Sequence, residues 1–261
     1  MRRGSLPAIV MLVWCPPGWT QGPSDADITA LIERSRAKAL DYARSLPDFV
    51  CTETIRRYAP FESQDRVWRH ADTLTVRLSY FQQKEEHKLV AIDDKPSDRK
   101  YEELAGVTGM GEFGGTLLMI FHPASETSFR WQGWKTVRGR KAAMYTYAVD
   151  AAHSRYKLSN GAVGHMHEAL VGFRGDLEVD SATGEVLQFT YLPDQIPKEL
   201  ELFYARTAVD YDFADVGGRD YLLPARSETE MYGRFAARSV TEFRDYHKFA
   251  ADSTVDFAPV K

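Results

Sequence analysis

The spacing of apolar and polar residues predicts one long helix near the start of the chain. Within residues 27–46 the apolar side chains recur every three or four positions, and charged side chains fill the opposite side. Ser24, followed three residues later by Asp27, is a capping-box pattern, and Pro47 ends the helix after Leu46. This amphipathic helix needs an apolar surface to cover. Its apolar stripe consists of Ile28, Leu31, Ile32, Ala39, Tyr42, Ala43 and Leu46.

Almost everything after this helix has the pattern of strands. In residues 72–81 Leu74, Val76, Leu78 and Tyr80 alternate with polar residues, which places them on one face of a sheet. Polar or glycine-containing links join neighbouring segments as hairpins. A short apolar helix is expected at 113–121, between two hairpins. The expected strands are 49–58, 72–81, 87–93, 129–137, 141–149, 177–180, 185–192, 202–213, 219–232 and 238–249.

Nine or ten strands in antiparallel order predict an α+β fold that is mostly antiparallel sheet. Strands and helices do not alternate, which argues against a doubly wound parallel sheet. We expect a single curved sheet or half-barrel, with the long N-terminal helix and one short inserted helix. No fixed repeat or low-complexity linker divides residues 23–261, so one β-rich domain is the simplest interpretation.

The first residues have the pattern of an export signal. Arg2 and Arg3 precede the apolar run 6–14, which is too short to span a bilayer. We expect residues 1–22 to be a signal peptide, and a cut after Ala26 is the alternative. Cys15, with Leu three residues before it, leaves lipidation as a competing interpretation. The mature chain would be periplasmic or secreted, with no transmembrane segment.

Charge and cysteine content limit the classes of partner and of covalent cross-link that the chain can have. Loss of residues 1–22 removes two of the 33 Lys and Arg residues and none of the 37 Asp and Glu residues. The net charge therefore falls from −4 to about −6. An acidic chain is a poor partner for nucleic acid, which requires a basic face. Cys51 alone would remain, so no intrachain disulfide is expected, and its FVCTE context fits a small buried side chain.

A G-x-G-x-x-G sequence at Gly109, Gly111 and Gly114 invites a nucleotide-binding interpretation. That fingerprint requires a strand that enters a tight glycine turn and then a helix, whose amides hold the pyrophosphate. The segment before Gly109, KYEELAGVT, has no apolar strand pattern, and Glu112 inside the loop would repel phosphate. We therefore expect no nucleotide and no other cofactor.

Two interpretations of the glycine-rich segment stay open. The residues after it are either a core helix that caps one end of the sheet or a mobile lid over an apolar cavity. Gly109, Gly111 and Gly114 would be the hinge candidates of the lid. Aromatic side chains nearby could line the cavity or simply pack in the core. The ligand-lining candidates are Phe113, Leu117, Phe121, Trp131 and Trp134.

His165 and His167 are the strongest candidates for metal binding, because residues i and i+2 of a strand share a face. The surrounding sequence KLSNGAVGHMHEALVG nevertheless resembles a polar loop, so we expect surface histidines and no metal site. No G-x-S-x-G nucleophile elbow is present, and we expect no catalytic residue.

The order of these elements resembles the periplasmic lipoprotein carriers of the LolA/LolB-like group. The hairpin GDLEVDSATGEVLQFTY (175–191) is similar to their strand–turn–strand units. The segments LPDFVCTETIRRY and GEFGGTLLMIF are similar to those of uncharacterised exported bacterial proteins. The resemblance implies a convex sheet that wraps helices and leaves an apolar cavity for acyl chains. The arginine that the carriers require near the barrel mouth has no motif here that would place it.

We therefore expect an exported, non-enzymatic binding protein. Its apolar concave face, covered by helices 27–46 and 113–121, would hold a lipid, an acylated protein or another protein, with transient proximity to a membrane. One alternative is a cell-envelope hydrolase that uses His165 or His167 with an acid. Another is a structural module of a surface assembly, with Cys51 free to bridge to a second chain.

Overall fold

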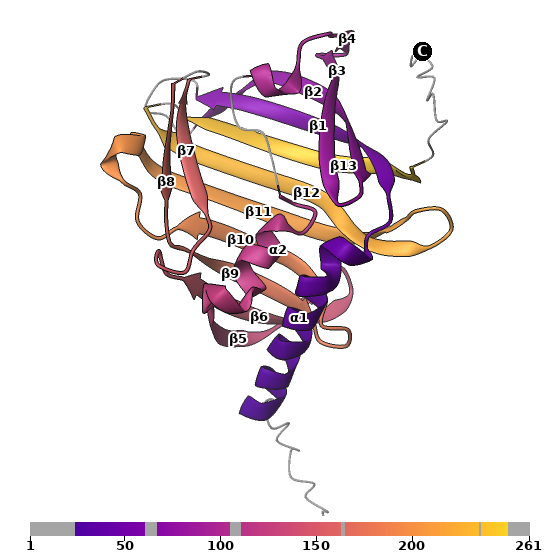
Figure 1. Cartoon of the computed structure of the whole chain (residues 1–261), viewed down its shortest axis with the longest axis vertical. Helices are drawn as coiled ribbons and strands as arrows, with labels where there is room; N and C mark the ends of the chain where they lie inside the picture. The colour runs from indigo at the N-terminus through magenta and orange to yellow at the C-terminus, as the bar shows by residue number, and fades with distance from the viewer. Residues whose placement is uncertain (1–23, 61–66, 105–110, 163–164, 235, 250–261) are drawn as a thin grey trace, which may run out of the picture.

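The computed structural model describes residues 24–60, 67–104, 111–162, 165–234 and 236–249, and side chains are not described for 161–166. One long helix and an antiparallel sheet of 11 strands make up most of it (Figure 1). The sheet is curved and not closed. The helices are α1 (Asp25–Ser45) and α2 (Gly115–Phe121), with the 3-10 turns η1 (Tyr101–Glu103), η2 (Pro123–Ser125) and η3 (Lys198–Leu200).

The strands of the large sheet follow the chain mainly as consecutive hairpins, and its order is β4-β3-β2-β1-β13-β12-β11-β10-β9-β6-β5. The last strand, β13, pairs with the first, β1, which joins the two ends of the chain in the middle of the sheet. The strands are β1 (Phe49–Pro60), β2 (Trp68–Phe81), β3 (Lys84–Ile92), β4 (Lys95–Pro96), β5 (Ser128–Val137), β6 (Arg140–Val149), β9 (Phe173–Asp180), β10 (Val186–Pro193), β11 (Leu202–Asp215), β12 (Asp220–Gly233) and β13 (Ala237–Lys248).

The predicted α+β class and curved antiparallel sheet are confirmed, and the element boundaries agree within a few residues. Three expectations require correction. The stretch taken for a polar loop forms the hairpin β7 (Lys157–Ala162) and β8 (His165–Leu170). The short strand β4 was missed, so the described strands exceed nine or ten. The inserted helix begins at Gly115, because residues 112–114 form a turn before it.

Helix α1 begins as its sequence predicts. The Ser24 hydroxyl accepts from the Asp27 amide, and the Asp27 carboxylate accepts from the Ser24 amide, which completes the capping box. The helix ends with Leu46 in extended conformation, the conformation favoured before Pro47. The apolar stripe lies against the sheet, but only three of its side chains, Leu31, Ile32 and Ala39, are buried. The polar side chain of Ser35 is buried beside them.

One face of the sheet is covered by α1, α2 and the β7–β8 hairpin (Figure 1). The largest apolar cluster lies between α1, α2 and strands β5, β6, β9, β10, β11 and β12. On β2 the predicted alternation is confirmed, since Leu74, Val76, Leu78 and Tyr80 are all buried. Each large apolar side chain removed from water contributes about 1.5–3 kcal/mol, so this covered face holds the fold together.

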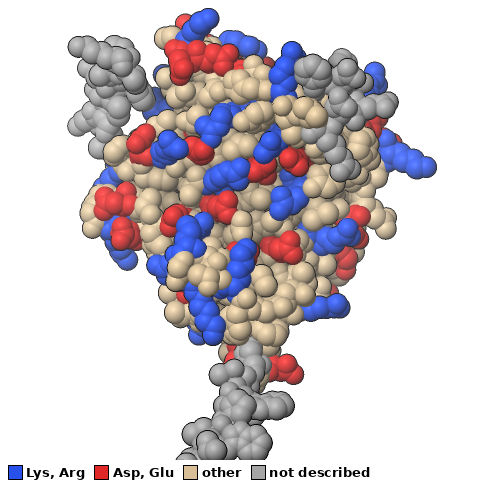
Figure 2. All heavy atoms as spheres, turned by 180° about the vertical axis from the view of Figure 1, so that it is seen from behind, with Lys and Arg blue, Asp and Glu red and all other residues tan. Residues whose placement is uncertain are grey.

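The opposite face is polar and carries charges of both signs (Figure 2). Arg56 and Arg244 both pair with Glu242, and Arg238 pairs with Glu228. Half-exposed ion pairs of this kind contribute only about 0–1 kcal/mol each. This face is therefore hydrated, whereas the covered face carries most of the apolar side chains.

Among the described residues, no helix has the length and apolar character needed to cross a membrane.

Candidate functional site

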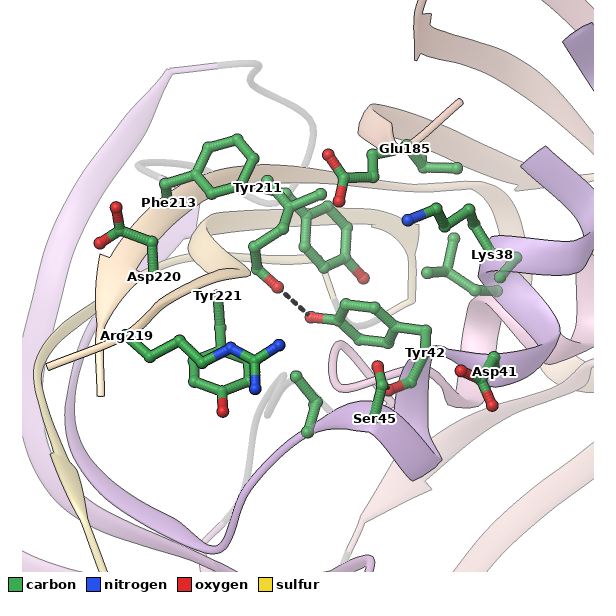
Figure 3. Close-up of a pocket in the computed structure, with 15 residues that line it drawn as sticks. Lys38, Asp41, Tyr42, Ser45, Glu185, Tyr211, Phe213, Arg219, Asp220 and Tyr221 are labelled. Atoms are coloured by element: carbon green, nitrogen blue, oxygen red, sulfur yellow. Dashed lines mark hydrogen bonds between the residues drawn. The ribbon is translucent and has the colours of Figure 1, made fainter. Parts of the chain in front are cut away.

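A cleft opens on the covered face beside the C-terminal half of α1 (Figure 3). Its cavity measures about 260 Å³. The walls come from α1 and its C-cap, from α2, from the start of β10, and from the ends of β11 and β12 that meet at their turn. The lining residues are Lys38, Ala39, Asp41, Tyr42, Ser45, Leu46, Leu117, Glu185, Val186, Tyr211, Phe213, Arg219, Asp220, Tyr221 and Leu222.

The floor of this cleft, which we call the α1 cleft, is apolar. Leu117, Tyr211 and Leu222 belong to the largest buried cluster. Tyr42 packs edge-on against Tyr211, with ring centroids 5.7 Å apart, and its hydroxyl donates to the Leu222 carbonyl oxygen at 2.9 Å. Burial raises the pKa of both tyrosines well above its ordinary value. Both hydroxyls are therefore neutral at any physiological pH and act as hydrogen-bond groups, not as bases.

The rim of the α1 cleft is charged. Lys38 of α1 and Arg219 of the β11–β12 turn reach towards it from opposite sides (Figure 3), and neither has a salt-bridge partner among the described residues. The Arg219 guanidinium lies over the Tyr221 ring, 5.4 Å from its centroid. Asp41, Glu185 and Asp220 add three acids to the rim. An apolar floor with a charged rim of both signs suits an amphipathic ligand.

The sheet separates next to the α1 cleft. Strands β10 and β11 pair only between 188–191 and 207–210. Beyond that point Arg138, in the β5–β6 turn, donates to the carbonyl oxygens of Leu187 and Tyr211, which lie next to the last residues paired between β10 and β11. A cavity of about 420 Å³ adjoins this gap and shares Phe213, Asp220 and Leu222 with the α1 cleft.

The five predicted ligand-lining residues occupy four different places. Leu117 lies in the floor of the α1 cleft. Phe113 is buried among Phe49, Tyr80 and Phe243, and Phe121 is buried in the largest cluster. Trp131 and Trp134 line a separate cavity beside the N-terminal half of α1.

The hinge candidates differ in their surroundings. Gly109 lies outside the described residues. Gly111 and Gly114 both have positive φ, at 90° and 109°. A Cβ atom on Gly114 would lie 3.1 Å from Ala43 Cβ and 3.1 Å from a ring carbon of Tyr42. Glycine at 114 therefore allows the start of α2 to approach α1 closely, whatever its role in motion.

His165 and His167 lie on strand β8, so the expected loop there was wrong. His167 is exposed, and the side chain of His165 is outside the described set. Within the described ranges, no three His, Cys, Asp or Glu side chains come close enough to hold a metal ion.

A buried ionic cluster that the sequence did not suggest lies under η1. His87 Nδ1 lies 3.1 Å from a Glu53 carboxylate oxygen, and its Nε2 lies 3.6 Å from Glu85. The Tyr101 ring stacks on the imidazole at 5.0 Å. Burial lowers the pKa of His87, but the two carboxylates outweigh it and raise that pKa to about 10. An imidazole with its pKa raised in this way carries a positive charge at neutral pH, so His87 pairs with the two carboxylates while its ring packs against η1 through Tyr101.

Cys51 is buried in the apolar cluster with Phe49 and Phe243, as the sequence predicted. Burial raises the pKa of its thiol far above the ordinary value. Because only 3% of Cys51 is exposed, its sulfur cannot reach a second chain, which corrects the idea of a Cys51 bridge in a surface assembly.

Most residues of the α1 cleft were missed by sequence reasoning. Tyr42 was expected in the apolar stripe of the helix, and Leu117 was a ligand candidate. Lys38, Glu185 and Arg219 lie far apart in sequence and within ordinary polar stretches. Only the pairing of distant strands brings them together, so no local signal could have identified them.

Comparison with known proteins gives structural likeness only. Neither a protein-family model nor a curated protein sequence matches this chain. A LolA superfamily protein from Nitrosomonas europaea is 9% identical, with a TM-score of 0.37 over 84% of this chain and 91% of the other. A DUF1329 family protein from Desulfovibrio piger is 11% identical, with a TM-score of 0.45 and coverages of 87% and 95%.

A third solved structure, described as an outer membrane lipoprotein-sorting protein domain from Vibrio parahaemolyticus, is 8% identical. Its TM-score is 0.40, and the match covers 85% of this chain and 94% of the other.

Proposed function

We propose that this chain is an exported, non-enzymatic binding protein that holds the apolar part of a lipid or of an acylated protein against the covered face of its sheet. The α1 cleft would receive the apolar group, and its charged rim would face the polar end of the ligand. Export to the periplasm or beyond follows from the signal-like residues 2–14 and belongs to the same proposal.

The observation that carries the proposal is the apolar floor of the α1 cleft. Leu117, Tyr211 and Leu222 connect it directly to the largest apolar cluster, so a ligand that enters would extend an existing core. A cavity of about 260 Å³ lies just below the ~300–1,000 Å³ typical of small-ligand sites. As it stands, it would admit the end of one acyl chain, not a whole lipid.

A larger cavity would require α1 to move, and its attachment suits that role. Only Leu31, Ile32 and Ala39 are fully buried apolar residues of this 21-residue helix. Side-chain hydrogen bonds to backbone oxygens provide other contacts between α1 and the sheet. Tyr145 donates to the carbonyl oxygen of Ile28, and Tyr80 to that of Ala43. Such bonds contribute about 0.5–1.5 kcal/mol each, and the buried Leu31 and Ile32 side chains add about 1.5–3 kcal/mol each, so these contacts together set the cost of lifting α1.

The α2 helix would follow α1. Leu117 is buried and the next residue, Leu118, is exposed, so part of the apolar surface of this short helix meets solvent. Gly111 and Gly114, both with positive φ, would be the hinge points if α2 moves. The core-helix interpretation of α2 remains the alternative, in which the glycines serve close packing alone.

Mass spectrometry of an organic extract tests the proposal. The protein would be purified without detergent from the periplasmic fraction of the expressing cells, and lipid would be quantified per chain. We expect one lipid per chain or less, in a reproducible ratio. A protein that is empty and takes up no lipid from vesicles would contradict the proposal and favour a structural module.

A further inference from the structure

A second cavity lies beside the N-terminal half of α1. It measures about 360 Å³ and is enclosed by the first turns of α1, the β5–β6 hairpin and the turn after β9. Its lining residues are Asp27, Ile28, Ala30, Leu31, Arg34, Trp131, Trp134, Tyr145 and Ser181. We call it the tryptophan cavity.

Two indole rings form adjacent walls of this cavity. Trp131 and Trp134 lie with ring centroids 6.2 Å apart and an angle of 73° between their planes. Trp134 is 38% exposed, although large aromatic side chains are usually well buried. Lys141 covers one face of Trp134, with Nζ 4.1 Å from the ring centroid. The faces of these rings carry negative charge density and attract polarised C–H groups.

The cavity also has an unused hydrogen-bond donor. Trp131 Nε1 is buried and has no hydrogen-bond partner among the described residues. A buried N–H without an acceptor costs about 1–3 kcal/mol, so an acceptor at this point would be favourable. Arg34 donates through Nη2 to the Ser181 carbonyl oxygen at 3.0 Å, and its other N–H groups have no hydrogen bond there.

An acceptor is present as well. One oxygen of the Asp27 carboxylate accepts hydrogen bonds from the Ser24 amide and the Ser24 hydroxyl. The lone pairs of the other carboxylate oxygen are not used in these bonds. Asp27 and Arg34 carry opposite charges, which disfavours both a simple anion and a simple cation. A neutral ligand with hydroxyl groups satisfies both residues, because each hydroxyl can donate and accept.

We propose that the tryptophan cavity binds a pyranose ring. The C–H face of the sugar would lie on an indole, a ring substituent oxygen would accept from Trp131 Nε1, and hydroxyl groups would bond to Arg34 and Asp27. The volume fits this size of ligand, since 360 Å³ is near the lower end of the range for small-molecule sites. The two cavities share no lining residue, although α1 forms a wall of each.

Indole N–H resonances in a ¹H–¹⁵N correlation spectrum provide the test, because the sequence has only five tryptophans. The probe is N-acetylglucosamine, whose acetamido carbonyl oxygen is a strong acceptor. We expect saturable shifts of the Trp131 and Trp134 resonances, with a dissociation constant on the order of 1 mM. Trp68 is the internal control, because it packs on Tyr232 and does not line the cavity.

Two variants assign and check the effect. Trp131→Phe identifies one resonance, and Trp134→Ala should weaken binding about tenfold or more, as loss of a contact worth 1.4 kcal/mol would. Sorbitol, an open-chain polyol, should cause no shift. The proposal is overturned if N-acetylglucosamine moves no indole resonance at about 10 mM. It is also overturned if sorbitol acts equally, or if a folded Trp134→Ala protein binds as the wild type does.

Discussion

At the scale of single residues, two neighbouring glycines illustrate what sequence alone leaves undetermined. The G-x-G-x-x-G pattern suggested either a phosphate loop or a hinge, and the structure reveals a packing constraint at Gly114 that neither anticipates. Gly114 has φ 109° and lies against Ala43 and Tyr42. Gly115, the next residue, has ordinary φ and no neighbour within 4 Å of an added Cβ. Identical residue types therefore have opposite tolerance to substitution.

We predict that Gly114→Ala destabilises the protein by about 1–3 kcal/mol, because alanine is strained at that φ and crowds α1. Gly115→Ala should be neutral or stabilise by up to about 1 kcal/mol, since it restricts the unfolded chain and favours the helix. Urea denaturation of both variants measures the difference. Equal effects of the two substitutions would show that Gly114 is not constrained by its contact with α1.

A second prediction at this scale concerns Glu112, the acid inside the glycine-rich turn. Burial, reinforced by the charge of Glu53, raises its pKa to about 7. In the unfolded chain Glu112 loses its proton near pH 4.5. Between about pH 4.5 and pH 7 the unfolded state therefore binds fewer protons, and the free energy of unfolding falls as pH rises.

Glu112→Gln should remove this fall in the free energy of unfolding with rising pH, because glutamine stays neutral. At pH 8 we expect the variant to be more stable than the wild type by on the order of 2–3 kcal/mol, and near pH 4 the two should be similar. Denaturation curves at both pH values measure this, with the exposed acid substituted in Glu86→Gln as a control. A difference that does not depend on pH would exclude a buried charge at Glu112 as its cause.

At the scale of elements, sequence patterns predicted the helices and strands whose formation depends on the local spacing of apolar residues. The capping box and Pro47 defined α1, and alternation on β2 identified its buried face. The β7–β8 hairpin was missed because its strands contain Gly161 and several polar residues, and only Leu158 is clearly buried in the adjoining cluster. Tertiary contacts, not local propensity, make that segment a hairpin.

The attachment of α1 gives a prediction at the same scale. Tyr42→Phe and Tyr80→Phe each remove a hydroxyl that donates to a backbone oxygen beside or within α1. We expect a loss of about 0.5–1.5 kcal/mol for each. Amide hydrogen exchange should become faster in α1 and stay unchanged in the central strands β12 and β13.

Tyr221→Phe is the matched control, since no hydrogen bond of its hydroxyl is found among the described residues. Uniformly faster exchange would contradict a separable α1.

At the scale of the whole molecule, the general architecture was predictable and the site was not. All ten of the expected strands and both helices follow from periodicity, but the order of the strands across the sheet decides which side chains meet. Leu117, Tyr42 and Arg219 converge only because β11 and β12 end beneath α1. The same sheet order separates Trp131 and Trp134 from Leu117, although the sequence suggested one common lining.

The central claim is that an apolar ligand enters the α1 cleft. The most direct test is to measure palmitate binding by native mass spectrometry. Ala39 is buried in the cleft, whereas Ala37 is exposed on the other side of the same helix. Ala39→Trp should fill the cleft at a stability cost of about 1–3 kcal/mol, so folding is checked by thermal unfolding. Ala37→Trp is the matched control.

We predict that the wild type and the Ala37→Trp variant take up palmitate, and that folded Ala39→Trp protein takes up at least about tenfold less, as expected for a lost contact of 1.4 kcal/mol or more. Equal uptake by all three proteins would place the ligand elsewhere. Absence of palmitate from the wild type would contradict the lipid-binding account itself.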